Sequence, residues 1–300
     1  MLQKFSDSPA STRVRWAELL PDDFMARMRE RPVVYLPLGL CEPHGHIAAL
    51  GLDTIKAEYY CDEAARRCGG IVAPTHGYHI HECGFHAAWL ASVVGEQNPL
   101  LAALPPHVMA LHFLYLLRAF YNTGFASVVV VSGHAGGSQI DLRRVATLFA
   151  ARSGMQVTLK TDVEWLGGLH PGDHAGKYEI SQLMAIRPDL IDLSRLARAE
   201  EGGRLALGSD AAEANSTFGQ QVNEAILKAI CSQVTLEVAP LTKPIVREPM
   251  TYATTEEMWK ELRAQIPDWR SVSPSPGVLA PQESRWAPYE SVADLLGPPA

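Results

Sequence analysis

The chain alternates between short apolar runs and longer segments whose apolar residues recur at helical spacing. Runs of β-branched and other apolar residues predict strands at 33–38, 71–74, 126–132 and 156–160. Helical spacing and terminal glycines predict helices at 54–68, 106–121, 138–153 and 216–232, and another from about residue 175. A helical entry is expected in the first thirty residues, and a late strand at 234–238. This alternation predicts a mostly parallel sheet covered on both faces by helices.

The C-terminal part of the chain has a different composition. Ten of the 21 prolines fall from Pro240 onward, yet Trp259, Trp269 and Trp286 also lie in this region. Large aromatic side chains usually cover something. We therefore expect one α/β domain over residues 1–240 and a proline-rich extension over 241–300, which packs on that domain or on a neighbouring subunit.

Charge and composition exclude several classes of protein. The net charge of -7 leaves no overall basic surface for nucleic acid. No apolar run approaches the roughly 18–20 residues of a membrane-spanning helix, and the N-terminus lacks the apolar core of a secretory signal. The five cysteines form no CxxC motif. A cytoplasmic protein with reduced thiols is the expectation.

Histidine is concentrated in one part of the chain. All eleven histidines lie between His44 and His174, and several follow predicted strands. Histidine is the commonest neutral metal ligand and the usual proton carrier near neutral pH. Chance and a few hydrogen-bonded core histidines explain any one of them alone, but they explain the whole set less well.

Glu42-Pro43-His44 is the sharpest element of this region. In an extended segment residues i and i+2 project to the same side, and Pro43 stiffens the backbone between them. The segment follows the predicted strand 33–38, where open α/β sheets place their sites. Both side chains are therefore candidate metal ligands. Asp53, taken alone, is better explained as the N-cap of the next helix.

Two further segments carry candidate residues. His134 lies in a glycine-rich turn after the strongest strand, but this turn has neither GxGxxG nor P-loop spacing. Asp173 and His174 precede a predicted helix that carries Glu179. Either Asp173 is a helix cap and Glu179 a solvated side chain, or the segment supplies a proton-transfer residue, His174, and one more carboxylate ligand, Glu179. The histidines of loop 79–86 predict a lid or a support for the ligands.

Taken in order, these motifs resemble those of the creatininase (creatinine amidohydrolase) family. The matching residues are Glu42-Pro43-His44-Gly45, Asp53, Gly133-His134-Ala135-Gly136 and His174-Ala175-Gly176-Lys177-Tyr178-Glu179-Ile180-Ser181. The resemblance runs from about residue 32 to about residue 219. It implies a three-layer α/β/α sandwich and a site for one or two divalent metal ions, zinc, manganese or iron.

The resemblance also implies a role for each candidate residue. The implied metal ligands are Glu42, His44, Asp53, His134 and Glu179, and Asp53 bridges the ions if there are two. His174 is the expected proton carrier, and Glu179 is expected to take part in catalysis as well. The candidate substrate contacts are Gly136, Trp165, Asp173 and His81.

Departures from the family pattern concern the surroundings of the ligands. Pro43 stands where relatives commonly have Gln, and Ser132 and Gly137 stand where they have Asn. Some members have an acidic ligand where this chain has Gly136, so more depends on Glu179. These changes argue against creatinine itself as the substrate.

The sequence thus predicts a metal-dependent hydrolase that cleaves a non-peptide C–N bond of a small molecule, in a cyclic amide, lactam or formamide. A metal-dependent isomerase acting on a sugar-like substrate and a catalytically inactive metal-binding protein are the alternatives. Relatives often form hexamers, so a homo-oligomer is expected.

Overall fold

A four-stranded parallel sheet forms the centre of the molecule. The computed structural model describes residues 12–80, 84–86, 100–136, 138–200, 205–243 and 245–273. The strand order is β2-β1-β5-β6, with bounds β1 Val33–Leu38, β2 Ile71–Val72, β5 Ser127–Ser132 and β6 Gln156–Thr161. All three neighbouring pairs are parallel, and β1 and β5 pair along their whole length. The carboxyl ends of these two strands therefore lie side by side.

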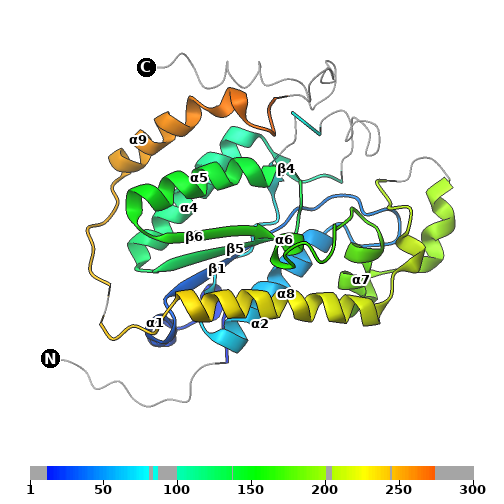
Figure 1. Cartoon of the computed structure of the whole chain (residues 1–300), viewed down its shortest axis with the longest axis horizontal. Helices are drawn as coiled ribbons and strands as arrows, with labels where there is room; N and C mark the ends of the chain where they lie inside the picture. The colour runs from blue at the N-terminus through cyan, green and yellow to red at the C-terminus, as the bar shows by residue number, and fades with distance from the viewer. Residues whose placement is uncertain are drawn as a thin grey trace.

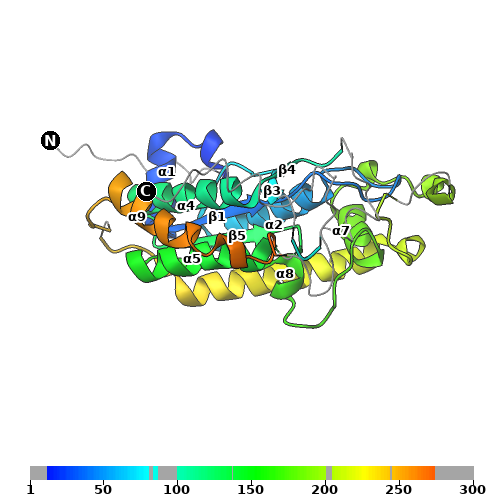
Figure 2. The ribbon, with the colours of Figure 1, turned by 90° about the horizontal axis from the view of Figure 1, so that it is seen from above.

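Helices cover both faces of this sheet (Figure 1). One face is covered by α4 Pro106–Thr123 and α5 Ser138–Ser153, and the other by α2 Leu52–Cys68 and α8 Ser216–Glu237. Figure 2 shows the same layers from above, with α7 Lys177–Ile186 beyond the end of the sheet. The expected three-layer α/β/α sandwich with a parallel sheet is confirmed.

The continuous apolar run of β1 contributes side chains to two hydrophobic cores, one on each face of the sheet. Val34 and Leu36 point into the core beneath α4 and α5, whereas Val33 and Tyr35 point into the core beneath α2 and α8. All four side chains are at most 2 % exposed. Successive strand residues face opposite sides, so a strand covered on both faces needs apolar residues at every position.

Shorter elements complete the described part of the chain. A small parallel pair, β3 His79–Ile80 and β4 Ala103–Leu104, lies apart from the main sheet. The short helices are η1 Trp16–Glu18, α1 Pro21–Glu30, α6 Asp162–Trp165, η2 Pro188–Leu190, η3 Leu193–Glu200, η4 Ala211–Glu213 and η5 Ile266–Asp268. Among the helices of these residues, none is both long and apolar enough to cross a membrane.

One expectation about local structure is wrong. Residues 234–238 are not a strand, because α8 continues to Glu237. Ile226, Ile230 and Val234 recur every four residues and are all buried, so the helical period extends into this segment. The expected helical entry is present as two short helices, η1 and α1, and Leu20 between them is 64 % exposed because Pro21 starts the second helix.

The described part of the C-terminal region packs on the helical layer formed by α4 and α5. Helix α9 Tyr252–Arg263 contacts both helices and crosses the top of Figure 1. Trp259 and Trp269 belong to the same apolar core as α4 and α5. Contact of the extension with a neighbouring subunit stays a prediction, and residues 274–300 lie outside the described residues.

Candidate metal centre

Two neighbouring strands bring the first candidate ligands together. Glu42 and His44 follow β1, and His134 follows β5 by two residues. Because β1 and β5 are adjacent and parallel, Glu42 Oε1 lies 2.8 Å from His134 Nδ1. Glu42 is 2 % exposed and His44 is fully buried. This is the position that parallel α/β sheets offer to a site.

Asp53 lies between the two histidines. Helix α2 begins at Leu52, with Gly51 as its N-cap, so Asp53 belongs to the first turn and the interpretation as an N-cap is wrong. Its Oδ1 is 3.4 Å from His44 Nε2, and its Oδ2 is 3.4 Å from His134 Nδ1. A Cβ atom at Gly133 would lie 2.0 Å from the Asp53 carbonyl oxygen. Glycine at 133 is therefore what lets the β5 turn approach this helix.

Glu179 closes the site from helix α7. Its Oε2 lies 3.4 Å from His44 Nε2 and accepts the backbone N–H of Ala175 at 2.9 Å. The Glu179 side chain is buried, which excludes the alternative of a solvated helix face. All five predicted ligands thus meet in one buried cluster, although they come from four separate segments.

The cluster contains two ligand groups that share Asp53. Glu42, Asp53 and His134 form one group; His44, Asp53 and Glu179 form the other. Within each group the possible ligand atoms lie within 4.8 Å of one another. The shared carboxylate has the position that a bridging ligand between two ions requires.

Several ligand atoms lack any hydrogen-bond partner in the described residues. These are His44 Nε2 and both carboxylate oxygens of Asp53. Buried polar atoms are normally hydrogen-bonded, so atoms left without a partner here fit direct coordination of a cation. The His44 Nδ1–H donates to the Glu42 carbonyl oxygen at 3.1 Å, which leaves Nε2 as the ligand atom. Carboxylate and imidazole ligands without a thiolate suit zinc, manganese or iron.

The carboxylates stabilise positive charge at the two imidazoles. Burial alone would lower the pKa of His134, but Glu42 and Asp53 outweigh it and raise the pKa to about 10. Burial likewise opposes charge on His44, yet Asp53 and Glu179 raise its pKa well above the usual range. An electrostatic environment of this sign favours a bound cation.

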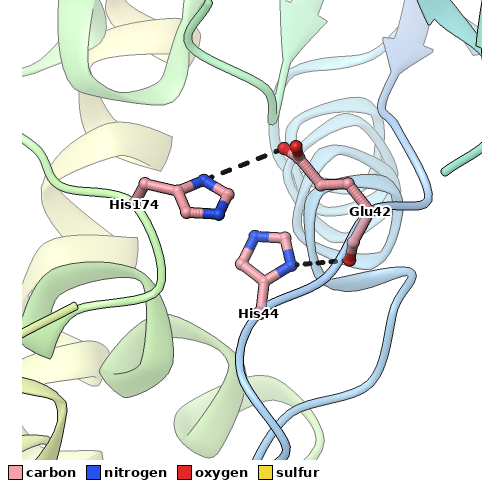
Figure 3. Close-up of side chains that lie close together, drawn as sticks. All are labelled: Glu42, His44 and His174. Atoms are coloured by element: carbon pink, nitrogen blue, oxygen red, sulfur yellow. Dashed lines mark hydrogen bonds and ion pairs between the residues drawn. The ribbon is translucent and has the colours of Figure 1, made fainter. Parts of the chain in front are cut away.

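His174 lies beside two of these ligands, Glu42 and His44 (Figure 3). Its ring stacks on that of His44 with centroids 4.8 Å apart, and its Nδ1 lies 3.9 Å from Glu42 Oε1. The Nε2–H donates to the Pro43 carbonyl oxygen at 3.2 Å. In this tautomer Nδ1 is left as a proton acceptor. The side chain is 23 % exposed, so a bound molecule can reach it.

A lysine that the sequence analysis did not select lies inside the same cluster. Lys56 is fully buried, with Nζ 2.6 Å from Glu179 Oε1, 3.3 Å from Asp162 Oδ2 and 3.9 Å from Asp53 Oδ1. Burial disfavours its charge, but these carboxylates raise the pKa of Lys56 well above the usual value. Its ammonium group therefore holds one oxygen of Glu179 and leaves the other facing His44.

The sequence contains only weak signals for Lys56 and its partner Asp162. Lys56 follows Asp53 by three residues on one helix and so shares its face. Asp162 directly follows β6, at the sheet edge where the candidate ligands also lie. Neither signal distinguishes a site residue from an ordinary helix face or cap.

The candidate substrate contacts are distributed unequally. Gly136 and Asp173 line a cavity of about 530 Å³ beside the cluster. The Asp173 carboxylate also accepts three backbone N–H groups at the start of α7, so it serves as a cap as well. Trp165 is buried in the core between the sheet and α8 and is not among the residues that line this cavity. His81 lies outside the described residues.

The loop expected to act as a lid is described only in part. His79 is buried, with its ring 5.2 Å from that of His134, and His86 lines the 530 Å³ cavity.

A larger cavity of about 730 Å³ lies beside Arg15 and Asp62, away from the candidate ligands.

Comparison with known proteins gives a family match over most of the chain. Residues 17–234 match the model of the creatininase family, described as creatinine amidohydrolase. Creatinine amidohydrolase from Pseudomonas putida is 25 % identical over 184 residues, which cover 55 % of this chain and 68 % of the relative.

Solved creatininase structures share the fold. A manganese creatininase has 22 % identity and a TM-score of 0.61, over 75 % of this chain and 98 % of that one. A mutant creatininase of the Zn–Zn type has 22 % identity and a TM-score of 0.60, over 76 % of this chain and 99 % of that one. The family match spans well over half of the chain. The chain belongs to the creatininase family, whose members are metal-dependent hydrolases of C–N bonds other than peptide bonds.

Proposed function

We propose that this chain is a metal-dependent amidohydrolase that cleaves a C–N bond in a small cyclic amide, lactam or formamide. The observation that carries the proposal is the pair of ligand groups joined by Asp53. Their buried atoms without partners, His44 Nε2 and both Asp53 oxygens, are arranged for coordination. The manganese and Zn–Zn forms of the structural relatives support a divalent metal at these residues.

Five residues would hold the metal, and a sixth would transfer the proton. Glu42, Asp53 and His134 would hold one ion; His44, Asp53 and Glu179 would hold a second if two are bound. A divalent metal supplies Lewis acidity, which polarises a carbonyl group and makes water more acidic. The chain's own residues orient the ligands, exclude bulk water from the buried side and carry the proton.

His174 is the proton carrier in this proposal. Its Nε2–H is held by the Pro43 carbonyl oxygen, so Nδ1 can accept a proton from the attacking water. The same Nδ1 can then deliver the proton to the leaving nitrogen. His174 also forms a ligand group with Glu42 and His44, but its partial exposure favours contact with the substrate.

The alternatives have less support. An isomerase could use the same ligands, but the family and the relatives matched here are described as amidohydrolases. The ligand cluster is complete without an acidic side chain at position 136, because the Glu179 carboxylate lies beside the His44 imidazole. This argues against a protein that has lost its metal-dependent activity.

Metal analysis and product release test the proposal. After chelation and reconstitution with Zn²⁺ or Mn²⁺, the wild type should bind stoichiometric metal, and Glu42→Ala and His134→Ala should lose much of it. His174→Asn should keep the metal but release ammonia or amine about a hundredfold more slowly. His112→Asn, an exposed histidine on α4, is the matched control and should change neither quantity. A wild type that binds no stoichiometric metal would refute the proposal.

A further inference from the structure

The 530 Å³ cavity next to the metal centre includes a residue from the C-terminal extension. Gly136 follows the candidate ligand His134 by two residues, and Asp173 directly precedes His174, so the inner wall adjoins the metal centre. Arg270 also forms part of the wall. The family match ends at residue 234, so Arg270 comes from a part of the chain outside it.

The charged side chains that line this cavity differ in whether they already have hydrogen-bond partners. Arg143 binds both oxygens of Glu164 at 2.5 and 2.6 Å, and its Nε donates to the Leu159 carbonyl oxygen. Asp173 accepts three backbone N–H groups of α7. The Arg270 side chain has no hydrogen bond or ion pair among the residues that the structure describes, and its buried Nε lacks a partner.

Arg270 is nevertheless held in place. Its guanidinium lies over the ring of Phe85, 3.7 Å from the centroid, a stacking geometry that leaves the N–H groups at the edge available. The backbone is fixed on both sides, because Phe85 N–H donates to the Arg270 carbonyl oxygen at 2.9 Å and Arg270 N–H donates to buried Asp141 at 3.0 Å. Asp141 also accepts the N–H and the hydroxyl of Ser271.

A Cβ atom at Gly84 would lie 2.4 Å from the Arg270 carbonyl oxygen, so this contact requires glycine. The guanidinium group is thus positioned before any ligand arrives, which lowers the entropy cost of binding.

We propose that Arg270 binds a carboxylate group of the substrate, so that the chain acts on small amides that carry one negative charge. A guanidinium fork matches a carboxylate through two parallel N–H···O bonds. Asp173 also lines this cavity, and its negative charge favours a singly charged group over a phosphate dianion, whereas the charge of Glu164 is already paired with Arg143. The substrate class rests on the hydrolase proposed above, whereas the anion site itself rests on Arg270.

Matched acid and amide probes test this proposal on the metal-loaded protein. Suitable pairs are pyroglutamate with pyroglutamamide, and N-formylglycine with N-formylglycinamide, which differ mainly in charge. We expect the wild type to prefer the acid of at least one pair by about tenfold or more, in calorimetric Kd or in kcat/KM, because a hydrogen-bonded charge contact is lost in the amide. Inorganic phosphate, added as a competitor, should bind more weakly than the acid.

Three variants assign the preference to the side chain. Arg270→Gln should reduce the affinity or kcat/KM for the acid by about tenfold or more and leave the value for the amide unchanged. Arg270→Lys should retain part of the preference for the acid. Lys260→Gln removes an exposed positive charge from α9, away from the cavity, and should behave as the wild type. Because the hydrogen bonds that anchor Arg270 are made by its backbone atoms, both Arg270 variants should melt close to the wild type.

The outcomes separate the two proposals. A wild type that distinguishes no pair, or a preference that survives in Arg270→Gln, overturns the anion site. Equal hydrolysis of acid and amide would overturn it while the hydrolase stands. Binding of the acid that depends on Arg270, with no hydrolysis of any amide tested, would support the anion site and contradict the hydrolase.

Discussion

Replacement of Lys56 by methionine removes a buried positive charge while keeping a side chain of similar length. In the native protein Nζ faces Glu179 at 2.6 Å and Asp162 at 3.3 Å, with Asp53 at 3.9 Å. At these distances each attraction amounts to about 4 kcal/mol or more for an effective dielectric constant of about 20, before desolvation is subtracted. Breaking a buried ion pair by removing one partner costs about 3–5 kcal/mol net.

The expected effect on melting follows from this free energy. A chain of this length unfolds with an entropy of about 0.6 kcal/mol/K, so the loss corresponds to roughly 5–8 °C in the melting temperature of metal-free protein. The raised pKa of Lys56 means that its stabilisation is fully present below the unfolded pKa. It is lost only as pH rises through the folded pKa, so neutral pH is suitable for the measurement.

Saturating Zn²⁺ or Mn²⁺ should reduce the defect of Lys56→Met, because the metal supplies positive charge to Glu179 and Asp53. Calorimetric unfolding with chelator and with metal measures both values. Arg66→Met is the matched control on the same helix. The Arg66 side chain is half exposed, its closer pair with Glu63 is on the surface, and Asp62, its second partner, keeps its hydrogen bonds to Arg15, so the loss should stay below about 1 kcal/mol. An unchanged melting temperature in chelator, or an equal loss with and without metal, would refute the reasoning.

Three further substitutions test other contacts. Gly133→Ala places a Cβ atom 2.0 Å from the Asp53 carbonyl oxygen, so it should weaken metal binding and lower the melting temperature; unchanged metal titrations would contradict this close approach. Asp141→Asn removes a charged acceptor from the backbone of Ser271 and should cost about 1.5–3 kcal/mol in denaturant unfolding, with earlier proteolysis of the C-terminal region; equal cleavage rates would contradict it. Tyr60→Phe removes a buried hydroxyl with two hydrogen bonds and should cost about 1–3 kcal/mol at unchanged metal content, and a loss of metal would show that the contact supports the site instead.

Local sequence patterns predicted the central strands β1 and β5 well because both are buried along their whole length. The run of β1 at 33–38 and helix α5 at 138–153 have the predicted bounds. The error at 234–238 arose because a short apolar run has the same appearance in a strand and in the last turn of a buried helix. The burial of Val234 beneath the sheet, a tertiary contact, decides for the helix.

Some of the candidate ligands could likewise be predicted from local sequence, and others could not. Glu42, His44 and His134 were selected because side chains after parallel strands share one edge of a sheet, which is a consequence of strand order. For Asp53 and Glu179 local reasoning left open a cap and a solvated face, and the resemblance supplied their roles as ligands. Their inward position depends on how α2 and α7 pack, which no local pattern encodes.

The sequence by itself determined the layered α/β class and the order of the ligand motifs, because hydrophobic period and backbone stiffness are local properties. Only the tertiary structure brought Lys56 to Glu179 across 123 residues, and the Arg270 backbone to Asp141 across 129. Such contacts depend on the relative placement of whole elements rather than on neighbouring residues. The metal ligands could therefore be recognised as motifs, whereas the charges that surround them emerged only when the helices and the C-terminal region packed together.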